Sequence, residues 1–175
     1  DEYISQIKYD LDWLGIDYDE TFNQSSRFDR YREQFEKLKA DGRIYPCYET
    51  PEELERKRKL LIAAGGKQVY DRSAMELTDQ QKKDYEAEGR KPHWRFLLKT
   101  ERMKWDDLLK GEIDIDLTSL SDPVLFREDG VPLYTFSSAV DDIDYDITNV
   151  IRGDDHTSNT AVQVEIINAL DQNKI

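Results

Sequence analysis

Apolar side chains recur at helical spacing near the start of the sequence. Residues 2–14 carry one stripe at i, i+3, i+7 and i+10, made by Ile4, Ile7, Leu11 and Leu14. This spacing is typical of an amphipathic helix. Residues 26–40 predict a second helix with one apolar face, formed by Phe28, Tyr31, Phe35 and Leu38. Gly15 and Gly42 follow the two stripes and predict where these helices end.

The next segment predicts a short strand followed by two capped helices. The short strand is expected at residues 44–48. Thr50-Pro51-Glu52-Glu53 is a strong helix start, because Thr50 caps the helix, proline suits the first position and Glu53 completes a capping box. This helix should run to about Ala64. A second capping box, Thr78-x-x-Gln81, starts a polar helix that should end at Gly89.

From residue 93 the apolar positions alternate with polar ones. Residues 94–99 and 113–117 both show the period of two that predicts strands. Residues 124–127 and 132–134 flank Glu128-Asp129-Gly130, which predicts a hairpin turn. Residues 148–152 predict a buried strand. A last helix should begin at Thr157 or Asn159, with an inward face made by Val162, Ile166, Ile167 and Leu170.

This order of elements predicts an α/β protein with an α+β insertion. Residues 1–44 and 131–175 resemble two halves of an α/β layer, and residues 45–130 form the block between them. The chain begins at Asp1 without a methionine and opens directly into a helical pattern. We therefore expect it to be a piece of a longer protein.

Composition narrows the class of protein. Charged residues make up 36% and the net charge is −13, which argues against a protein that coats DNA non-specifically. No run of 18 apolar residues exists, so no membrane span is expected. The single cysteine, Cys47, cannot form an internal disulfide, which suits a reducing, cytoplasmic location.

Charge is unevenly distributed along the chain. Residues 90–104 hold six cations against one acid, and among them Arg95 and Lys99 are candidate contacts to RNA phosphates. The alternative is a solvated strand edge that is protected by charge. Residues 141–155 are acidic, and Asp141, Asp142 and Asp144 suggest a carboxylate metal site only weakly, because such loops are usually solvated.

The segment from Val150 to Thr160 carries the clearest chemistry. A β-rich run delivers Arg152, Gly153 permits a turn, and Asp154, Asp155 and His156 precede a helix. An arginine at the end of a strand can hold a carboxylate with two hydrogen bonds, and a helix start can accept an anion or a nucleotide. The alternative is that Asp154 or Asp155 only caps the helix.

Several motifs in this order resemble bacterial glutamyl-tRNA synthetases, which are class I aminoacyl-tRNA synthetases. VIRGDDHTSNTAVQ is similar to the family's VIRGEDH-x-SNT segment. The resemblance covers nearly all of residues 1–170, and the other matching pieces include DLDWLGIDYDE, TPEELERKR, VYDRS, DDLLKGEIDID and DPVLFREDGVPLYTFSSAVDDIDYDIT. It implies a Rossmann-type catalytic domain interrupted by an insertion that binds the tRNA acceptor stem.

The resemblance also implies an activity and its site residues. The family uses ATP and Mg²⁺ to form glutamyl-adenylate, and then transfers glutamate to tRNA(Glu). Tyr134, Ser138 and Arg152 fall on the positions that hold glutamate, and Asp155 and His156 fall beside ATP. A hydrogen bond at the helix start is an equally weighted role for His156. A monomer is expected, and tRNA(Gln) remains an open second partner.

Two departures from the family change the expectations. The family often has asparagine where this chain has Ser138, which is shorter and carries no amide. Some members bind zinc through Cys-x-Cys, a tyrosine and a further cysteine. Here those positions hold Cys47, Glu49, Tyr70 and Ala74. Because one cysteine cannot complete such a four-ligand site, no zinc is predicted, and Cys47 is expected to be a small buried hydrophobe.

The class I signature motifs HIGH and KMSKS do not occur in the sequence. These motifs neutralise ATP phosphates in the transition state, so no catalytic residue is assigned and this chain alone should be inactive. Two alternatives stay open. One is a relative that acts as a glutaminyl- or glutamyl-queuosine tRNA synthetase, and the other is a tRNA-binding module without chemistry.

Overall fold

A computed structural model describes residues 2–171 of the chain. The described helices are α1 (Glu2–Leu14), α2 (Phe28–Ala40), α3 (Pro51–Ala63), α4 (Asp79–Ala87), α5 (Tyr134–Asp144) and α6 (Thr157–Leu170). The described strands are β1 (Ile44–Cys47), β2 (His93–Phe96), β3 (Arg102–Asp107), β4 (Gly111–Asp116) and β5 (Val124–Phe126). Short 3₁₀ turns occur at Gln24–Arg27, Ser73–Glu76, Leu117–Ser119 and Asp154–His156.

The strands form two antiparallel sheets. One has the order β1-β2-β5, with Ile44 opposite Phe96 and Cys47 opposite His93. The other is the β3-β4 hairpin, with Arg102 opposite Asp116. The fold is therefore mixed α and β, as expected. None of the strand pairs in residues 2–171 is parallel, so the parallel sheet of a Rossmann-type layer is not among the described elements.

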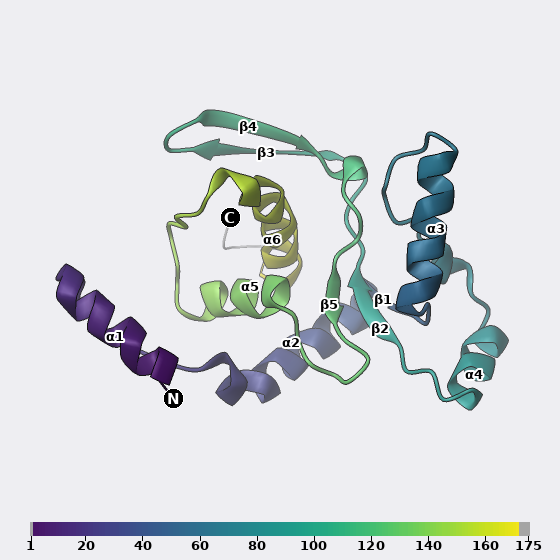
Figure 1. The fold of residues 1–175 in the computed structure, drawn as a ribbon, viewed down its shortest axis with the longest axis horizontal. Coiled ribbons are helices and arrows are strands. Elements are labelled where there is room, and N and C mark those ends of the chain that lie inside the picture. Colours follow the sequence, from purple (N-terminus) through teal and green to yellow (C-terminus); the bar gives the residue numbers. More distant parts are fainter. Residues whose placement is uncertain (1, 172–175) are drawn as a thin grey trace.

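The three-stranded sheet lies between two groups of helices. Helices α2, α5 and α6 pack on one side, and α3 lies on the other (Figure 1). The side chains of Tyr31, Phe96 and Phe136 are fully buried on the helical side. Strand β1 serves both faces because its side chains alternate. Ile44 joins the main core, whereas Tyr45 and Cys47 pack against Ala74 on the α3 side.

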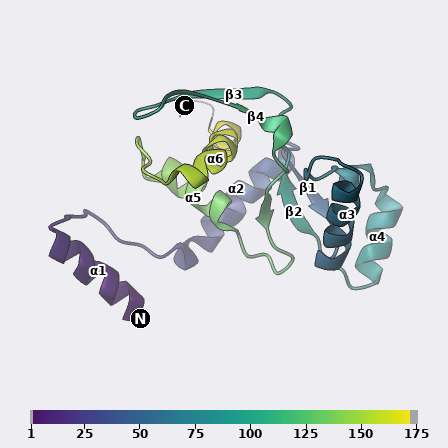
Figure 2. The ribbon, with the colours of Figure 1, turned by 45° about the horizontal axis from the view of Figure 1, so that its top comes forward.

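The β3-β4 hairpin lies over α6, as Figures 1 and 2 both show. Met103 and Leu117 are buried there against Ala161 of α6. Alternating burial along β3, with Met103 inward and Lys104 outward, matches its alternating sequence. The sequence predicted one strand over residues 94–99 and did not predict β3. In the structure the first strand ends at Phe96, and β3 begins separately at Arg102.

The capping boxes are confirmed. Thr50 Oγ1 accepts the Glu53 backbone N–H at 3.3 Å, and the Glu53 carboxylate accepts the Thr50 N–H at 2.9 Å. Thr78 and Gln81 make the same exchange at the start of α4. Each box satisfies two backbone N–H groups that have no partner inside the helix.

The prediction of a buried strand at residues 148–152 is wrong. These residues have no regular secondary structure, residues 148–151 are exposed, and Ile151 is fully exposed. A buried strand needs hydrogen-bonding neighbours and cover on both faces. None of the described strands pairs with this segment, so its apolar run carries no strand structure here.

Helix α5 was not predicted. Residues 132–134 were expected to complete a hairpin, and the chain does return beside β5, where Leu133 N–H donates to Leu125 O at 2.8 Å. Tyr134 then begins a helix instead of continuing the strand. The inward positions Phe136, Ala139, Val140 and Ile143 recur at i, i+3, i+4 and i+7, so the helical period was present in the sequence.

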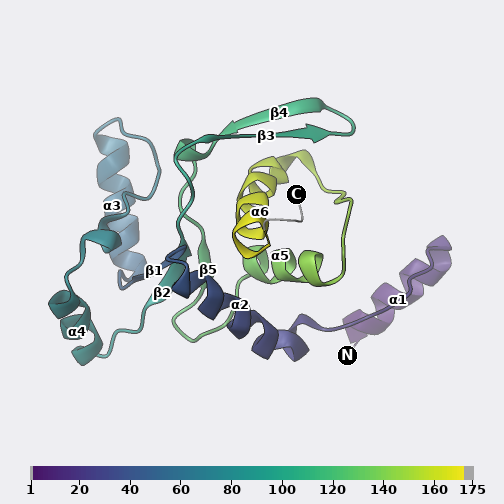
Figure 3. The same cartoon turned by 180° about the vertical axis from the view of Figure 1, so that it is seen from behind.

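Helix α1 stands away from the rest of the fold (Figures 1 and 3). The helix is present as predicted, but none of its described residues is buried. Its apolar side, including Ile7 and Leu14, is exposed. Within residues 2–171, no helix has both the length and the apolar character that a membrane span requires.

Candidate functional site

A polar seam runs along the contact between α5 and α6. Tyr134, Ser138 and Asp142 follow one another at four-residue spacing on α5, so they form one row along that helix. Helix α6 faces this seam with Thr160 and Gln163. The fully buried side chains of Phe136 and Ala139 hold α5 on the core and so fix the position of the row.

Ser138 is bound to both helices. Its hydroxyl donates to the Tyr134 carbonyl at 2.8 Å and accepts from Gln163 Nε2 at 2.6 Å. Gln163 is buried, and its Oε1 atom has no hydrogen-bond partner among the described residues. Gln163 on α6 therefore provides, beside Ser138, the amide group that Ser138 lacks. Its Oε1 atom remains free to accept a hydrogen bond. Tyr134 is 63% exposed.

Arg152 reaches the same helix from the exposed segment before α6. Its Nη1 atom donates to Thr160 Oγ1 at 3.2 Å, and the residue is half-buried. Within residues 2–171 it makes no ion pair with a carboxylate within 4.0 Å. Thr160 and Gln163 are one turn apart on α6, so the structure brings Arg152 and Ser138 to neighbouring turns of one helix.

Asp142 adds a carboxyl group to this seam. Burial raises its pKa above the ordinary value, and the positive charge of Arg152 acts in the opposite direction. The neighbouring Asp141 raises the pKa further. Burial without a direct cationic partner disfavours the charged form of a carboxyl group.

Asp155 and His156 lie at the start of α6 and are exposed. His156 Nε2 is 3.6 Å from Asp155 Oδ2, and its Nδ1 lies 2.9 Å from the Asn159 amide nitrogen. No side chain caps the start of α6, so the alternative that Asp154 or Asp155 is only a cap is not supported. Gly153 has φ −70°, which any residue can adopt, but a Cβ there would lie 2.6 Å from Asp155 Oδ1, so a larger residue would displace the Asp155 side chain.

Two acidic residues of α5, Asp141 and Asp144, are bound by arginines. Asp141 accepts hydrogen bonds from Arg27, Gln24 and Tyr31, with the Arg27 Nε bond at 2.8 Å. Asp144 accepts from Arg30 and Arg27. These arginines bind two of the three carboxylates that the sequence offered as a weak metal site. Asp141 and Asp144 therefore tie the α2 end of the fold to α5.

The basic run at residues 90–104 does not form one continuous face. Arg90, Lys99, Arg102 and Lys104 are each paired with a carboxylate. Lys99 has half of its side-chain surface exposed and lies 3.3 Å from Glu101 and 3.6 Å from Glu165. Arg95 lies inside the fold instead, with its guanidinium 4.2 Å from the centre of the Tyr70 ring and donating to the Asp122 carbonyl.

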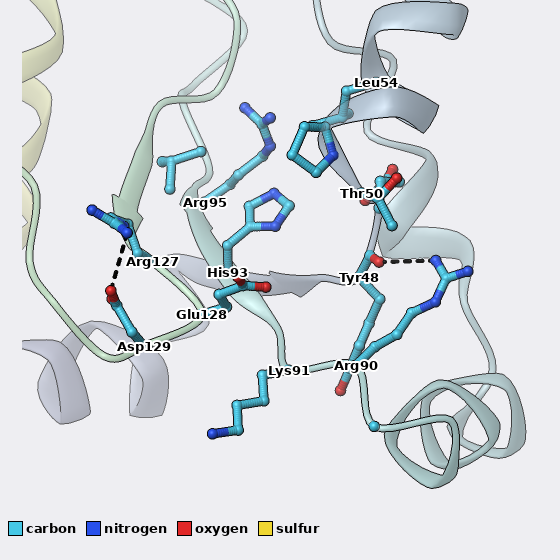
Figure 4. A pocket seen from close by; sticks show the side chains of 14 residues that line it. Tyr48, Thr50, Leu54, Arg90, Lys91, His93, Arg95, Arg127, Glu128 and Asp129 are labelled. Atoms are coloured by element: carbon cyan, nitrogen blue, oxygen red, sulfur yellow. Dashed lines mark hydrogen bonds and ion pairs between the residues drawn. The ribbon is translucent and has the colours of Figure 1, made fainter.

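Arg95 and His93 point from β2 into a cleft of about 640 Å³ (Figure 4). The start of α3 at Thr50 lies across from them, and Arg127 and Glu128 close another side. Burial lowers the pKa of His93 below its ordinary value, and the charge of Arg95 lowers it further. Both effects disfavour the charged form of the imidazole.

Sequence reasoning missed Thr160, Gln163 and His93. Gln163 could have been noticed, because it is a polar residue among Ala161, Val162 and Val164 on the inward side of a predicted helix. A polar side chain at such a position needs a partner. His93 carried no local signal, because its neighbours depend on which strand pairs with residues 93–96.

Comparisons with known proteins agree with the resemblance in the sequence. The family model described as tRNA synthetases class I (E and Q), catalytic domain, matches residues 1–174. The chain is 56% identical to glutamate–tRNA ligase 1 of Maricaulis maris over 168 residues, which is 96% of this chain and 38% of that protein. It is also 56% identical to glutamate–tRNA ligase 2 of Beijerinckia indica, covering 97% of this chain and 38% of that protein.

Solved structures show the same relationship. A glutamate–tRNA synthetase from Elizabethkingia anophelis has a TM-score of 0.83 at 27% identity, covering 97% of this chain and 37% of that one. A glutamate tRNA ligase from Elizabethkingia meningosepticum, solved in complex with its amino acid, has a TM-score of 0.81 at 27% identity, covering 91% of this chain and 35% of that one.

The chain thus spans about two fifths of the length of the curated relatives it matches. The family match extends over all the described elements, including the α5–α6 seam and the cleft beside β2. The chain belongs to the family of class I tRNA synthetase catalytic domains that serve glutamate and glutamine.

Proposed function

We propose that this chain is part of a glutamate–tRNA ligase and supplies contacts to glutamate, ATP and tRNA. In the proposed reaction the α-carboxylate of glutamate attacks the α-phosphorus of ATP, and pyrophosphate leaves. The terminal ribose hydroxyl of tRNA(Glu) then attacks the adenylate carbonyl, and AMP leaves. Two relatives bear the name glutamate–tRNA ligase, which supports this assignment over the glutaminyl and glutamyl-queuosine alternatives.

The glutamate pocket is proposed to lie on the α5–α6 seam. One observation carries the proposal: Arg152 is half-buried, has no ion pair among the described residues, and is held by Thr160 one turn from Gln163. A half-buried guanidinium without a carboxylate partner is an incomplete arrangement. Glutamate supplies that carboxylate.

Arg152 is proposed to hold the side-chain carboxylate. The α-carboxylate must attack phosphorus, and pairing it with a guanidinium would lower its nucleophilicity. Ser138 and Tyr134 then offer hydroxyl groups along the same row. Gln163, with its free Oε1, takes the place of the amide that many relatives carry at the Ser138 position and can accept from the glutamate ammonium group.

ATP is proposed to lie beside Asp155 and His156. The side chains of Asp155 and His156 are exposed at the start of α6, where they are accessible to a nucleotide. Mg²⁺ would neutralise phosphate charge when bound with ATP. Because HIGH and KMSKS are not in this sequence, the described residues bind and orient substrates and contribute no group that acts on the phosphates at the transition state.

The tRNA is proposed to contact Lys99 and Arg95 through its phosphates, with Lys99 at the surface and Arg95 from within the cleft. tRNA(Glu) is the proposed partner, and tRNA(Gln) is a second partner if the ligase accepts both. We propose a monomeric ligase in the cytoplasm. A tRNA-binding module without chemistry is less well supported, because it gives Arg152 and Gln163 no role.

The test is a steady-state comparison of Arg152→Gln with the wild type in the complete ligase. Removing a charge-assisted hydrogen bond of about 1.5–3 kcal/mol should raise the glutamate KM roughly 10- to 100-fold, with little change in the ATP KM. Arg32→Gln is the matched control, because Arg32 is 68% exposed and pairs only with Asp29. Equal changes in both KM values would argue against the assignment.

A further inference from the structure

Helix α6 is covered by the fold around its whole circumference. None of residues 157–170 is exposed. Val162 and Ile166 pack in the main core with α2 and α5, whereas Ala161 packs under the β3-β4 hairpin. A surface helix is oriented by its one apolar stripe, but a helix that is apolar all round has no such stripe. Apolar burial therefore fixes the rotation of α6 about its own axis only loosely.

Two buried polar side chains distinguish one side of α6 from the other. Gln163 and Glu165 are both buried. Because successive residues of a helix are about 100° apart, these two side chains point to opposite sides of α6. Gln163 Nε2 donates to Ser138 Oγ on α5 at 2.6 Å. On the other side Glu165 meets Arg43, which immediately precedes β1.

The carboxylate of Glu165 is paired with two cations. Arg43 Nη2 donates to Glu165 Oε2 at 3.1 Å, and Lys99 Nζ lies 3.6 Å from Oε1. The Glu165 side chain is only 1% exposed, and a carboxylate so deeply buried is costly unless it is paired. Arg43 makes the closer contact and is half-buried, whereas Lys99 is exposed. The Arg43 pair is therefore the contact that holds Glu165.

Arg43 is itself held on the sheet. Its Nη2 atom also donates to Leu97 O at 3.2 Å, and its carbonyl accepts the Leu97 N–H at 2.8 Å. Its guanidinium lies 4.7 Å from the centre of the Phe96 ring, which is fully buried. These contacts tie Arg43 to the end of β2. Glu165 thus connects α6 to the sheet through a side chain that has little freedom.

A small rotation of α6 would disturb the α5–α6 seam. Side-chain ends lie about 5–6 Å from a helix axis, so a rotation of about 10° moves them by about 1 Å. The hydrogen bond between Gln163 and Ser138 would then be too long. Thr160 holds Arg152 from the same side of α6, three residues before Gln163, so the same rotation would also move Arg152.

We propose that Glu165 is a positioning residue that sets the rotation of α6 through its ion pair with Arg43. The pair holds Gln163 against Ser138, and so acts on glutamate binding without touching glutamate. This inference rests on the proposed glutamate pocket. A buried polar group can select one register among several apolar packings even where it adds no stability.

The experiment compares the double variant Glu165→Leu, Arg43→Met with the wild type in the complete ligase. Apolar side chains of similar size often replace a buried ion pair without loss of stability, and circular dichroism checks the fold. We expect the glutamate KM to rise about 10-fold or more, with the ATP KM within about twofold of wild type. Glu165→Gln keeps an oxygen that accepts from Arg43, so its glutamate KM should stay within about threefold of wild type.

Glu55→Leu with Arg58→Met is the matched control, because it makes the same two substitutions in an ion pair on α3. Its glutamate KM should not change. Arg43→Gln alone is a smaller change than the double variant and should raise the glutamate KM in the same direction, so the proposal stays testable if the double variant does not fold. A role in stability alone predicts that a folded double variant keeps the wild-type KM.

A crystal structure of the double variant reads the position of α6 directly. Gln163 Nε2 should lie more than about 3.5 Å from Ser138 Oγ. The proposal is overturned if Gln163 still binds Ser138 there, or if the glutamate KM is unchanged while Arg152→Gln raises it. A wild-type KM in Arg152→Gln would instead refute the proposed pocket, and the contact between Gln163 and Ser138 would still decide whether Glu165 sets the rotation.

Discussion

At the scale of single residues, charge pairing fixes the base of α5. Arg30 donates to both oxygens of Asp144, and Arg27 reaches Asp144 and Asp141 together. The hydrogen bonds from Arg30, followed by those from Arg27, lower the pKa of Asp144. Its side chain is only 19% exposed, so solvent screens these contacts incompletely.

The lowered pKa of Asp144 predicts a pH-dependent loss of stability in Asp144→Asn. A carboxyl group whose pKa is lower in the folded state stabilises the fold above its ordinary pKa, and this contribution is lost as pH falls through the folded pKa. We expect Asp144→Asn to lose about 1–3 kcal/mol at pH 7. The difference from wild type should shrink below about pH 4.

Urea-induced unfolding of this chain at several pH values provides the measurement. Glu36→Gln serves as the control, because Glu36 is an exposed acid on the same helix α2 and should change little. A difference between Asp144→Asn and wild type that stays constant down to the lowest pH would show that the ion pairs do not cause it.

Sequence motifs predicted part of the candidate site. They identified Arg152 and Ser138 as site residues, and in the structure both contact α6. Gln163 and His93 could not be assigned from a motif, because their roles arise from helix packing and strand register. For Arg95 the sequence was misleading. Its place in a basic run predicted a surface cation, but its guanidinium stacks on Tyr70 and donates to the Asp122 carbonyl.

At the scale of elements, local signals located helices better than strands. Both capping boxes begin helices where predicted, because the N-cap and the N3 residue satisfy each other within one turn. Residues 148–152 failed as a strand, because an apolar run forms a buried strand only when neighbours accept its hydrogen bonds. Helix α5 was missed because a turn signal outweighed the helical spacing that follows it.

The elements also explain why two candidate sites exist. The α5–α6 seam lies on the helical side of the sheet, and the cleft beside β2 lies near the start of α3 (Figures 1 and 4). Strand β1 contributes to both sides because its side chains alternate. The cleft beside β2 and the proposed glutamate pocket are therefore built on opposite faces of one sheet, and each can be altered by itself.

At the scale of the whole molecule, the net charge of −13 opposes the binding of RNA. An acidic protein repels nucleic acid at long range, so contacts must come from a few local cations. Most cations of residues 90–104 are already paired with carboxylates of the chain. Lys99 remains the best candidate at the surface, because its ion pairs with Glu101 and Glu165 are longer, at 3.3 and 3.6 Å.

The tRNA proposal predicts that Lys99→Gln weakens binding of tRNA(Glu) by the complete ligase. Each phosphate contact that is lost should reduce the slope of log K against log salt by about 0.7–0.9. Titration at several salt concentrations provides the measurement, and Arg32→Gln on α2 is again the surface control. A slope that does not change would leave Lys99 as part of a solvated surface.

The central claim is that Arg152 and the α5–α6 seam hold glutamate. A crystal structure of the complete ligase with glutamate bound tests it most directly. We predict that the Arg152 guanidinium lies about 2.7–3.2 Å from the side-chain carboxylate of glutamate, with Ser138 and Gln163 lining the same pocket. Glutamate bound by other residues, with Arg152 still contacting only Thr160, would contradict the account.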